Sequence, residues 1–326
     1  MIDVSVVIPA YNAAEYIEDA IASATAQSLE NIEIIVVDDR STDDTRERAA
    51  LMAADDPRIS LLALPRNGGP SAARNAGIAA ARGTWIALLD ADDSYEPQRL
   101  ATLLDLAQGR HADLVADNLM LIEEANGATM PMMPPGFLPE PRRIDLAEFI
   151  ERNISKPDAP RTNYGFLKPL MRRKFLTDHA IRYDEHVRFA EDFALYVDCL
   201  RAGAIWWLHP DPMYRYLVRG NSLTQIQTVG DLDRLRQRQR ALLAEARRKG
   251  DGRFASLIAR HLRGVDRCYY YRGFTDELKA RRFGKAMGYF FSGPDSMGLI
   301  GLESARQLPL ILRKAWRGGY RRRSGS

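Results

Sequence analysis

The 326-residue sequence predicts an α/β protein with a mainly parallel sheet flanked by helices and a helical region at its carboxyl end. Two observations support this fold class. Apolar runs of strand length alternate with segments whose apolar residues recur at helical spacing, which is the pattern of parallel strands joined by helices. After residue 225 the strand patterns stop, and leucines recur at helical spacing with arginines between them.

The alternation begins close to the amino terminus. Its strand-length runs are apolar and rich in β-branched residues, and they are bounded by residues typical of turns. Parallel strands need crossover connections, which are nearly always right-handed, so we expect helices between them. The predicted strands are 4–8, 32–37, 59–64, 84–89 and 112–117, and the predicted helices are 17–27, 46–52, 71–81 and 97–108.

The alternation of strand and helix patterns becomes less regular from residue 123. Residues 123–141 carry Gly, Pro and Met without a clear period, so we expect an irregular loop there. A helical pattern over residues 186–202 carries Glu191 and Asp192 in its first turn. Acidic residues at a helix start also serve simply to complement the helix dipole.

Composition divides the chain into two parts. We predict one domain over residues 1–225 and a basic helical region over residues 226–326. The formal net charge of +3 is too small to indicate a nucleic-acid partner, and two cysteines without metal-ligand spacing fit a reducing compartment. There is no signal-peptide pattern and no uncharged run of membrane-spanning length, so we expect a cytoplasmic protein.

One strand ends in a cluster of carboxylates. The apolar run from Thr84 to Leu89 is followed by Asp90, Asp92 and Asp93. Ligands bind at the carboxyl ends of strands in open α/β sheets, and two aspartates one residue apart can face a single hard cation. An isolated pair of this kind also occurs in solvated turns and helix caps, so the pair alone leaves both interpretations open.

Several ordered motifs together resemble family 2 glycosyltransferases with the GT-A fold, and this resemblance implies a Rossmann-like sheet that is mixed and mainly parallel. The resemblance covers residues 3–225, and within the family it is greatest to the bacterial exopolysaccharide enzymes, including those of succinoglycan assembly. Agreement of several motifs in order is far more specific than any one of them. The motifs are Pro9-Ala10-Tyr11-Asn12, Asp38-Asp39, Arg66-Asn67-Gly68-Gly69, Ala73-Arg74-Asn75-Ala76-Gly77, Asp90-Ala91-Asp92 and Glu191-Asp192.

The resemblance implies a nucleotide site formed by Pro9, Tyr11, Asn12 and Asp39. The Tyr11 ring would stack on a uracil base, and the Asp39 carboxylate would accept the imide N–H of that base. A helix cap is the alternative role for Asp39, because Ser and Thr residues nearby are typical of caps.

The same resemblance implies how a diphosphate is held. Arg74 would bind it through charge-assisted hydrogen bonds, although a surface helix arginine is the alternative. Asp92 would be the direct ligand of Mg²⁺ or Mn²⁺, with Asp90 nearer the ribose or the waters on the metal. Asp93 is then expected to be only a turn residue.

Catalysis is assigned by the resemblance to Asp192. As general base it would remove the proton of an acceptor hydroxyl while the oxygen attacks the sugar, so one displacement inverts the anomeric configuration. Glu191 would orient Asp192 or the acceptor, or only complement the helix dipole. Arg215 and Arg219 are candidates for contacting the acceptor or the diphosphate.

The implied reaction moves one sugar from a nucleotide-sugar donor, expected to be a UDP-sugar, to a glycan acceptor carried on a lipid. From residue 281 apolar residues alternate with arginine and lysine, a combination suited to peripheral contact with an anionic membrane at the inner face of the plasma membrane. A solvated basic tail after a packing helix is the alternative.

Other classes of protein explain less of the sequence. A dinucleotide-dependent oxidoreductase needs a glycine-rich first turn, and residues 9–14 contain no glycine. A phosphatase with an aspartyl nucleophile would use Asp90 and Asp92 but leave the other motifs without a role. A binding module for sugar nucleotides or polysaccharides, without turnover, remains an alternative.

Overall fold

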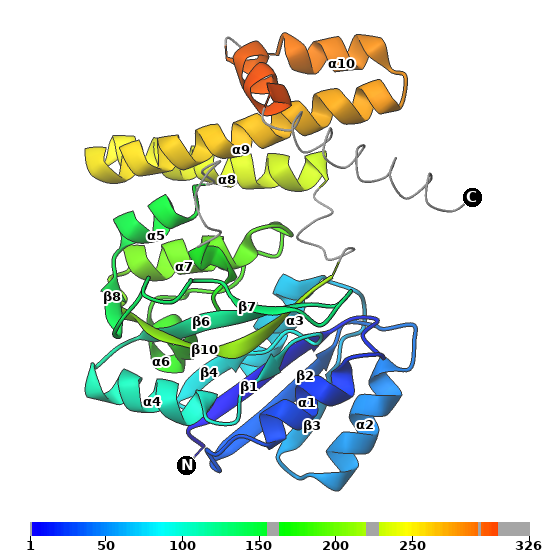
Figure 1. The fold of residues 1–326 in the computed structure, drawn as a ribbon, viewed down its shortest axis with the longest axis vertical. Helices are drawn as coiled ribbons and strands as arrows, with labels where there is room; N and C mark the ends of the chain where they lie inside the picture. Colours follow the sequence, from blue (N-terminus) through cyan, green and yellow to red (C-terminus); the bar gives the residue numbers. More distant parts are fainter. Residues whose placement is uncertain (1, 155–162, 220–227, 293–294, 306–326) are drawn as a thin grey trace. The chain divides into compact units, whose positions relative to one another are not determined.

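The computed structural model describes residues 2–154, 163–219, 228–292 and 295–305 (Figure 1). Their contacts form two compact units. The first comprises residues 2–153 and 163–219, and the second comprises the helical residues from 228 to 305. Each unit is described by itself.

A ten-stranded sheet is the centre of the first unit. The strand order is β3-β2-β1-β4-β9-β6-β10-β5, with β7 paired to β6 and β8 paired to β10. The strands are β1 Val4–Ala10, β2 Ile32–Asp38, β3 Ile59–Ala63, β4 Trp85–Leu88, β5 Ser94–Tyr95, β6 Leu114–Glu123, β7 Thr129–Pro131, β8 Arg142–Ile144, β9 Leu170–Arg172 and β10 Trp206–Val218.

The sheet is mixed, as the sequence predicts. The longest pairings, between β1 and β2 and between β6 and β10, are parallel. Strand β3 also pairs with β2 in parallel, and β4 pairs with β1 in parallel. The short strand β9 runs antiparallel between β4 and β6. Strands β1 and β2 are buried almost throughout, which explains their continuous apolar sequences.

One expectation about this sheet was wrong. The loop predicted over residues 123–141 contains β7, which pairs with β6 in an antiparallel hairpin. The strand is only three residues long and mostly exposed, so no apolar period marks it in the sequence.

Helices cover the sheet of the first unit. Helix α3 packs on β1 and β2, and helix α4 packs on β6. Helix α7 packs against α5 and the 3₁₀ helix η1. Their bounds are α1 Ile17–Thr25, α2 Thr45–Asp55, α3 Pro70–Ala80, α4 Arg99–Gly109, α5 Leu146–Arg152, η1 Tyr164–Phe166, α6 Arg173–Asp178 and α7 Glu191–Arg201.

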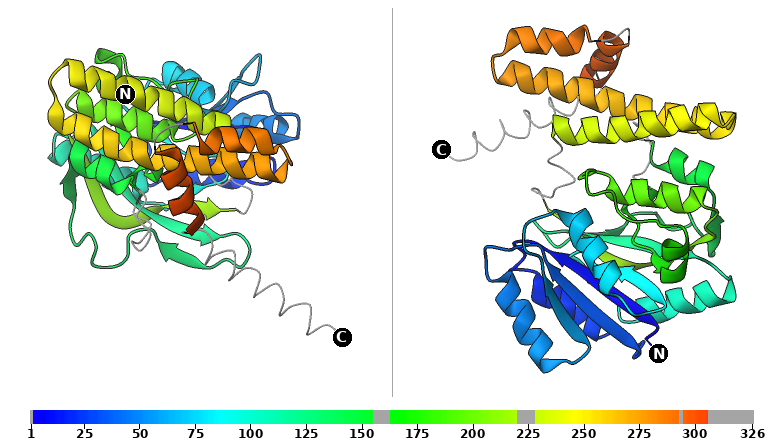
Figure 2. Two further views of the ribbon diagram at one scale, coloured as in Figure 1. Left: turned by 90° about the horizontal axis from the view of Figure 1, so that it is seen from above. Right: turned by 180° about the vertical axis from the view of Figure 1, so that it is seen from behind.

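The second unit consists of helices. Helices α8 (Val229–Arg248) and α9 (Gly252–Lys279) lie alongside one another in both views of Figure 2, and α10 (Phe283–Phe290) packs on α9. Leu232 and Leu235 are buried, as their helical spacing predicts. Each helix in the described part of the chain is too short or too polar to span a bilayer.

A close contact between α3 and the sheet generates a stability prediction. A Cβ atom on Gly77 would lie 2.3 Å from Cγ1 of Val7 and 3.1 Å from Cγ2 of Val37. Gly77→Ala should therefore destabilise the first unit by about 1–3 kcal/mol through overpacking. The measurement is the midpoint of urea unfolding, read by circular dichroism.

The matched control is Gly109→Ala at the end of α4, where an added Cβ meets no atom within 4 Å. This change should leave the midpoint unchanged or raise it slightly, because alanine has the higher helix propensity. Equal midpoints for the two variants would show that α3 does not press on the sheet at Gly77.

Candidate active site

The carboxyl ends of three neighbouring parallel strands carry the candidate residues. Strand β1 lies between β2 and β4 in the sheet. Tyr11 follows β1, Asp39 follows β2 and Asp90 follows β4, so these residues lie on one edge. In open α/β sheets this edge is where ligands bind.

Two buried cations join three carboxylates beside this edge. Arg74, on α3, donates from Nη2 to Oδ1 of Asp90 and from Nη1 to Oε1 of Glu191, both at 2.7 Å. The Nζ of Lys168 lies 2.9 Å from Oδ2 of Asp90 and 2.6 Å from Oδ2 of Asp192. The side chains of Arg74 and Lys168 are each only 5% exposed. The sequence motifs at Arg74, Asp90 and Glu191-Asp192 therefore meet in one charged cluster, which we call the buried charge network.

Burial and pairing act in opposite directions on these groups. Burial disfavours the charged form of Asp90, but Lys168 and Arg74 outweigh it and lower the pKa of this carboxyl below its ordinary value. Burial also opposes the charge on Lys168, yet Asp192 and Asp90 raise the pKa of the ammonium group well above its ordinary value. For Glu191, burial dominates over the attraction of Arg74 and raises the pKa of the carboxyl.

The backbone of Lys168 is itself held by a buried ion pair. Its carbonyl oxygen accepts a hydrogen bond from Nη2 of Arg99 at 2.5 Å, and Arg99 pairs with Asp117 at 2.8 Å. Neither side chain of that pair is exposed. Tyr196 donates to the carbonyl of Leu167 at 2.9 Å, so the peptide groups before and after the Cα of Lys168 are both held by hydrogen bonds.

Sequence reasoning missed Lys168 and Tyr183. Lys168 precedes Pro169, and a residue before proline is typical of a turn. Tyr183 lies in a segment without period, and its hydroxyl donates to Oδ1 of Asp192 at 2.8 Å. The one available signal for Lys168 is its place just before the apolar residues of β9. A lysine buried at such a place needs an acidic partner, because lysine is rarely buried unpaired.

Asp192 stands at the start of α7, as predicted. Tyr183 contacts one of its carboxylate oxygens and Lys168 the other. The residue before this helix turn, Ala190, has φ 57° and ψ 34°, a left-handed conformation that is strained for a residue other than glycine. A carboxylate offers about four acceptor positions, so both oxygens retain room for one further donor.

Arg219 covers the second aspartate of the motif. Its guanidinium forms an ion pair with Asp92 and lies 4.9 Å from the centre of the Tyr16 ring. Tyr16 in turn donates to Glu124 at 2.8 Å. Burial and the nearby charge of Asp90 raise the pKa of Asp92, whereas Arg219 lowers it.

The residues fit a divalent metal that is shared with a ligand. Both oxygens of Asp90 are engaged by Arg74 and Lys168, whereas Asp92 meets only one cation among the contacts described. In the described ranges, no cluster of three or more histidine, cysteine or carboxylate side chains is suited to hold a metal alone. Mg²⁺ is commonly bound by one or two carboxylates together with substrate phosphates, and Asp92 suits that arrangement.

Asp93 has a larger role than the turn expected from the sequence. Its buried carboxylate accepts hydrogen bonds from the Tyr214 hydroxyl at 2.7 Å and from the backbone N–H of Leu217 at 2.8 Å. Burial, together with Asp92 and Asp90, raises the pKa of Asp93 well above its ordinary value. Asp93 therefore ties the loop after β4 to β10, a contact between residues more than 120 positions apart.

The predicted nucleotide residues form a connected set of loops. The oxygens of Asp39 accept from the backbone N–H groups of Gly68 and Gly69, each at 2.7 Å, so Asp39 fixes the loop before α3 and does not cap α2. The side-chain oxygen of Asn12 accepts from the N–H of Thr42 at 2.9 Å. Pro9 lies within β1 and Tyr11 directly after it, with the Tyr11 side chain about half exposed.

The structure places two further arginines that the sequence singled out. Arg74 is buried, so the alternative of a surface arginine was wrong. Arg215 pairs with Glu96 at 2.8 Å, and both side chains are more than 40% exposed. The structure therefore brings Arg219, but not Arg215, into contact with the acidic motif.

Known proteins similar in sequence to this chain share one family. Residues 5–175 match the profile of a family described as Glycosyl transferase family 2. The chain is 41% identical over 300 residues to succinoglycan biosynthesis protein ExoU of Rhizobium meliloti (strain 1021), covering 91% of this chain and 85% of ExoU. It is 34% identical over 306 residues to ExoO, a succinoglycan biosynthesis protein of the same strain, covering 94% and 86%.

A solved structure shares the fold. A crystal structure of S. aureus TarS in complex with UDP-GlcNAc aligns with a TM-score of 0.68 at 20% identity, covering 92% of this chain and 82% of that one. Mixed sheet, motifs and relatives lead to the same assignment. The chain belongs to glycosyltransferase family 2.

Proposed function

We propose that this glycosyltransferase moves one sugar, with inversion, from a UDP-sugar to a hydroxyl of a growing exopolysaccharide chain carried on a lipid. The main support is the buried charge network, which joins Arg74 and Asp90 to Asp192 in one cluster. A group that binds the leaving diphosphate and a group that accepts a proton are then within reach of one donor sugar.

The loops after β1, β2 and β3 bind the donor nucleotide. The exposed ring of Tyr11 offers a stacking surface for the base, and Asp39 keeps lone pairs for a base N–H beyond those used by Gly68 and Gly69. Pro9 and Asn12 shape this loop. TarS, which has the same fold, was crystallised with UDP-GlcNAc, and this favours a nucleotide sugar as the donor.

Asp192 acts as the general base. The acceptor hydroxyl oxygen attacks the anomeric carbon, the bond from that carbon to the diphosphate oxygen breaks, and the hydroxyl proton passes to the Asp192 carboxylate. Lys168 and Tyr183 hold this carboxylate in one orientation, and Glu191 keeps Arg74 in place. Arg74 stabilises the negative charge that develops on the diphosphate.

Arg219 and Asp92 serve the leaving diphosphate. A Mg²⁺ or Mn²⁺ ion held by Asp92, with Asp90 behind it, would neutralise that charge. Arg219 pairs with Asp92 in this structure, and we propose that it turns to the phosphates when the donor binds. Arg215, at its exposed position beside Glu96, is a candidate only for the acceptor.

A lipid-carried acceptor requires the enzyme to work at a membrane surface. Phe283, Met287 and Phe291 follow one another at four-residue intervals on and just after α10, and they are 65%, 42% and 65% exposed. Residues at this spacing share one side of a helix. Lys285 and Arg281 add positive charge close by. We propose that this exposed α10 row contacts the anionic inner face of the plasma membrane, with the enzyme on the cytoplasmic side.

The more carboxyl-terminal residues of the predicted membrane segment, from Leu308 to Arg323, lie outside the described residues. The α10 row is therefore the part of that prediction which can be tested by named substitutions.

The first prediction concerns Asp192. Asp192→Asn keeps the volume but removes the base, so transfer of labelled sugar from UDP-sugars to a bacterial lipid extract should fall by about 10²–10⁴-fold. Stabilisation by UDP with Mn²⁺ in a thermal-shift assay should be retained, because the residues proposed to bind the nucleotide and the metal are unchanged. The control is Asp198→Asn on the same helix, which should transfer normally. A binding module without turnover would show no transfer in any of the three proteins.

The second prediction concerns Lys168. Lys168→Met removes the cation between Asp90 and Asp192 and leaves two buried carboxylates facing each other, which should cost about 3–5 kcal/mol of stability and abolish transfer. Lys174→Met is the control, because Lys174 is 79% exposed and its pair with Asp178 is worth little. Thermal unfolding and sugar transfer are both measured. Equal losses in the two variants would rule out a special role for Lys168.

The third prediction concerns the α10 row. The double variant Phe283→Ser and Phe291→Ser should lose sedimentation with vesicles that contain anionic phosphatidylglycerol, and wild-type binding should weaken as salt is raised. Leu51→Ser is the control, because Leu51 is as exposed as either phenylalanine but lies on α2. Unchanged sedimentation of the double variant would exclude this surface from membrane contact.

A further inference from the structure

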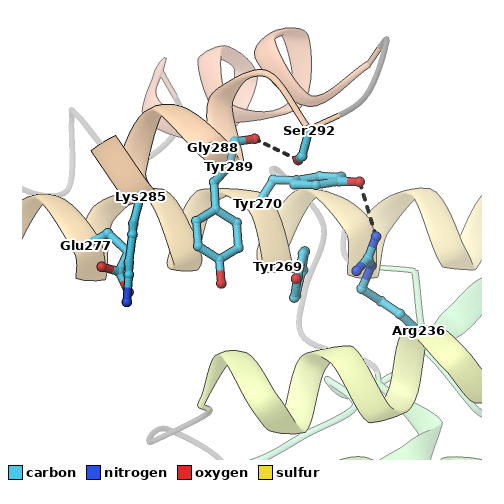
Figure 3. Close-up of a pocket in the computed structure, with 8 residues that line it drawn as sticks. All are labelled: Arg236, Tyr269, Tyr270, Glu277, Lys285, Gly288, Tyr289 and Ser292. Atoms are coloured by element: carbon cyan, nitrogen blue, oxygen red, sulfur yellow. Dashed lines mark hydrogen bonds between the residues drawn. The ribbon is translucent and has the colours of Figure 1, made fainter. Parts of the chain in front are cut away.

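A pocket with no role in the proposed reaction lies within the second unit. It is bordered by α8, α9 and α10 and by Ser292, two residues after α10, and its volume of about 620 Å³ falls in the range of small-molecule sites (Figure 3). Aromatic and polar side chains line it. They are Arg236, Tyr269, Tyr270, Glu277, Lys285, Tyr289 and Ser292, together with the backbone of Gly288.

Three tyrosines dominate this lining. The ring centres of Tyr269 and Tyr270 are 5.2 Å apart, and those of Tyr269 and Tyr289 are 5.6 Å apart, each pair edge to face. Figure 3 shows Tyr269 and Tyr289 next to one another and Tyr270 directed toward Arg236. All three side chains are partly exposed, so their rings border the pocket and are not sealed in the core.

Packing fixes the rings from behind. Tyr289 lies against Gly273 of α9, where an added Cβ would be 2.4 Å from Cε1 of the ring. The guanidinium of Arg236 lies 3.8 Å from the centre of the Tyr269 ring, and Nη2 donates to the Tyr270 hydroxyl at 3.2 Å. The aromatic surface is therefore preorganised, which lowers the entropy cost of binding.

Most of the charges around the pocket are compensated within the protein, and the exposed ammonium group of Lys285 is the exception. Arg236 is only 6% exposed and donates to Asp266 at 2.6 Å and to Asp233 at 2.9 Å. Glu277 pairs with Arg282, and Lys285 lies beside Glu277. A phosphate ligand would meet one exposed cation, Lys285, next to the carboxylate of Glu277, which repels an anion, and a lipid tail would need an apolar lining.

We propose that this pocket binds an uncharged stretch of a glycan chain. A sugar ring has an apolar C–H face that packs on an aromatic ring and hydroxyl groups that exchange hydrogen bonds with tyrosine and serine hydroxyls. The aromatic and hydroxyl-bearing part of the lining, from Tyr269, Tyr270, Tyr289 and Ser292, matches that ligand class. The inference draws on the proposed function only in expecting a polysaccharide chain to be present near the enzyme.

The test measures binding directly. The full chain is titrated by calorimetry with uncharged β-linked and α-linked glucose pentasaccharides and with a galacturonic acid pentasaccharide. We expect at least one uncharged oligosaccharide to bind, with Kd raised by about tenfold or more in Tyr269→Ala and in Tyr289→Ala. Tyr271→Ala, which changes a neighbouring tyrosine of α9 outside the pocket lining, should bind as wild type does.

Two further measurements keep the result interpretable. Tyr289→Phe retains the packing on Gly273 and removes only the hydroxyl, so it must fold as wild type and bind more weakly. The thermal shift produced by UDP must be the same in all variants. The proposal is overturned if no uncharged oligosaccharide binds, if the pocket variants bind as well as Tyr271→Ala, or if the charged oligosaccharide binds best. None of these outcomes affects the roles proposed for Asp192 and Asp92.

Discussion

The pairing of Lys168 and Arg74 with Asp90, Glu191 and Asp192 is the interaction on which the candidate active site depends. The five side chains come from α3, the loop after β4, the segment before β9 and the start of α7. A buried charge without a partner is so costly that none of these segments is stable in its position alone. Charge pairing therefore assembles the site, and the same pairing sets the ionisation of its groups before any ligand arrives.

Local features of this site could be predicted from the sequence. Asp90 and Asp92 follow an apolar run, and Glu191 and Asp192 occupy a first helical turn, so both positions follow from patterns within ten residues. The resemblance to a family then linked these positions. The parallel part of the sheet was predictable for the same reason, because its long strands carry continuous apolar runs.

Features that depend on contacts across space could not be predicted. Lys168 meets Asp192 24 positions later, and its backbone meets Arg99 69 positions earlier. No periodic pattern in the sequence predicts contacts between residues so far apart. Asp93 is an aspartate like Asp90 and Asp92, so the sequence does not distinguish it from them. It is a buried acceptor for Tyr214 only because β10 packs against the loop after β4. Short strands such as β7 and β9 form because a partner strand is at hand, and three residues are too few for a period.

The left-handed conformation of Ala190 has a consequence for any attempt to stabilise this enzyme. Such a conformation costs a residue with a side chain about 1–3 kcal/mol, and it lies directly before Glu191 and Asp192. Glycine would adopt it without strain, but it would also allow the helix start many other directions. A glycine at position 190 would therefore raise thermostability but loosen the orientation of the Asp192 carboxylate. Directed evolution for heat resistance should vary this position while selecting for activity.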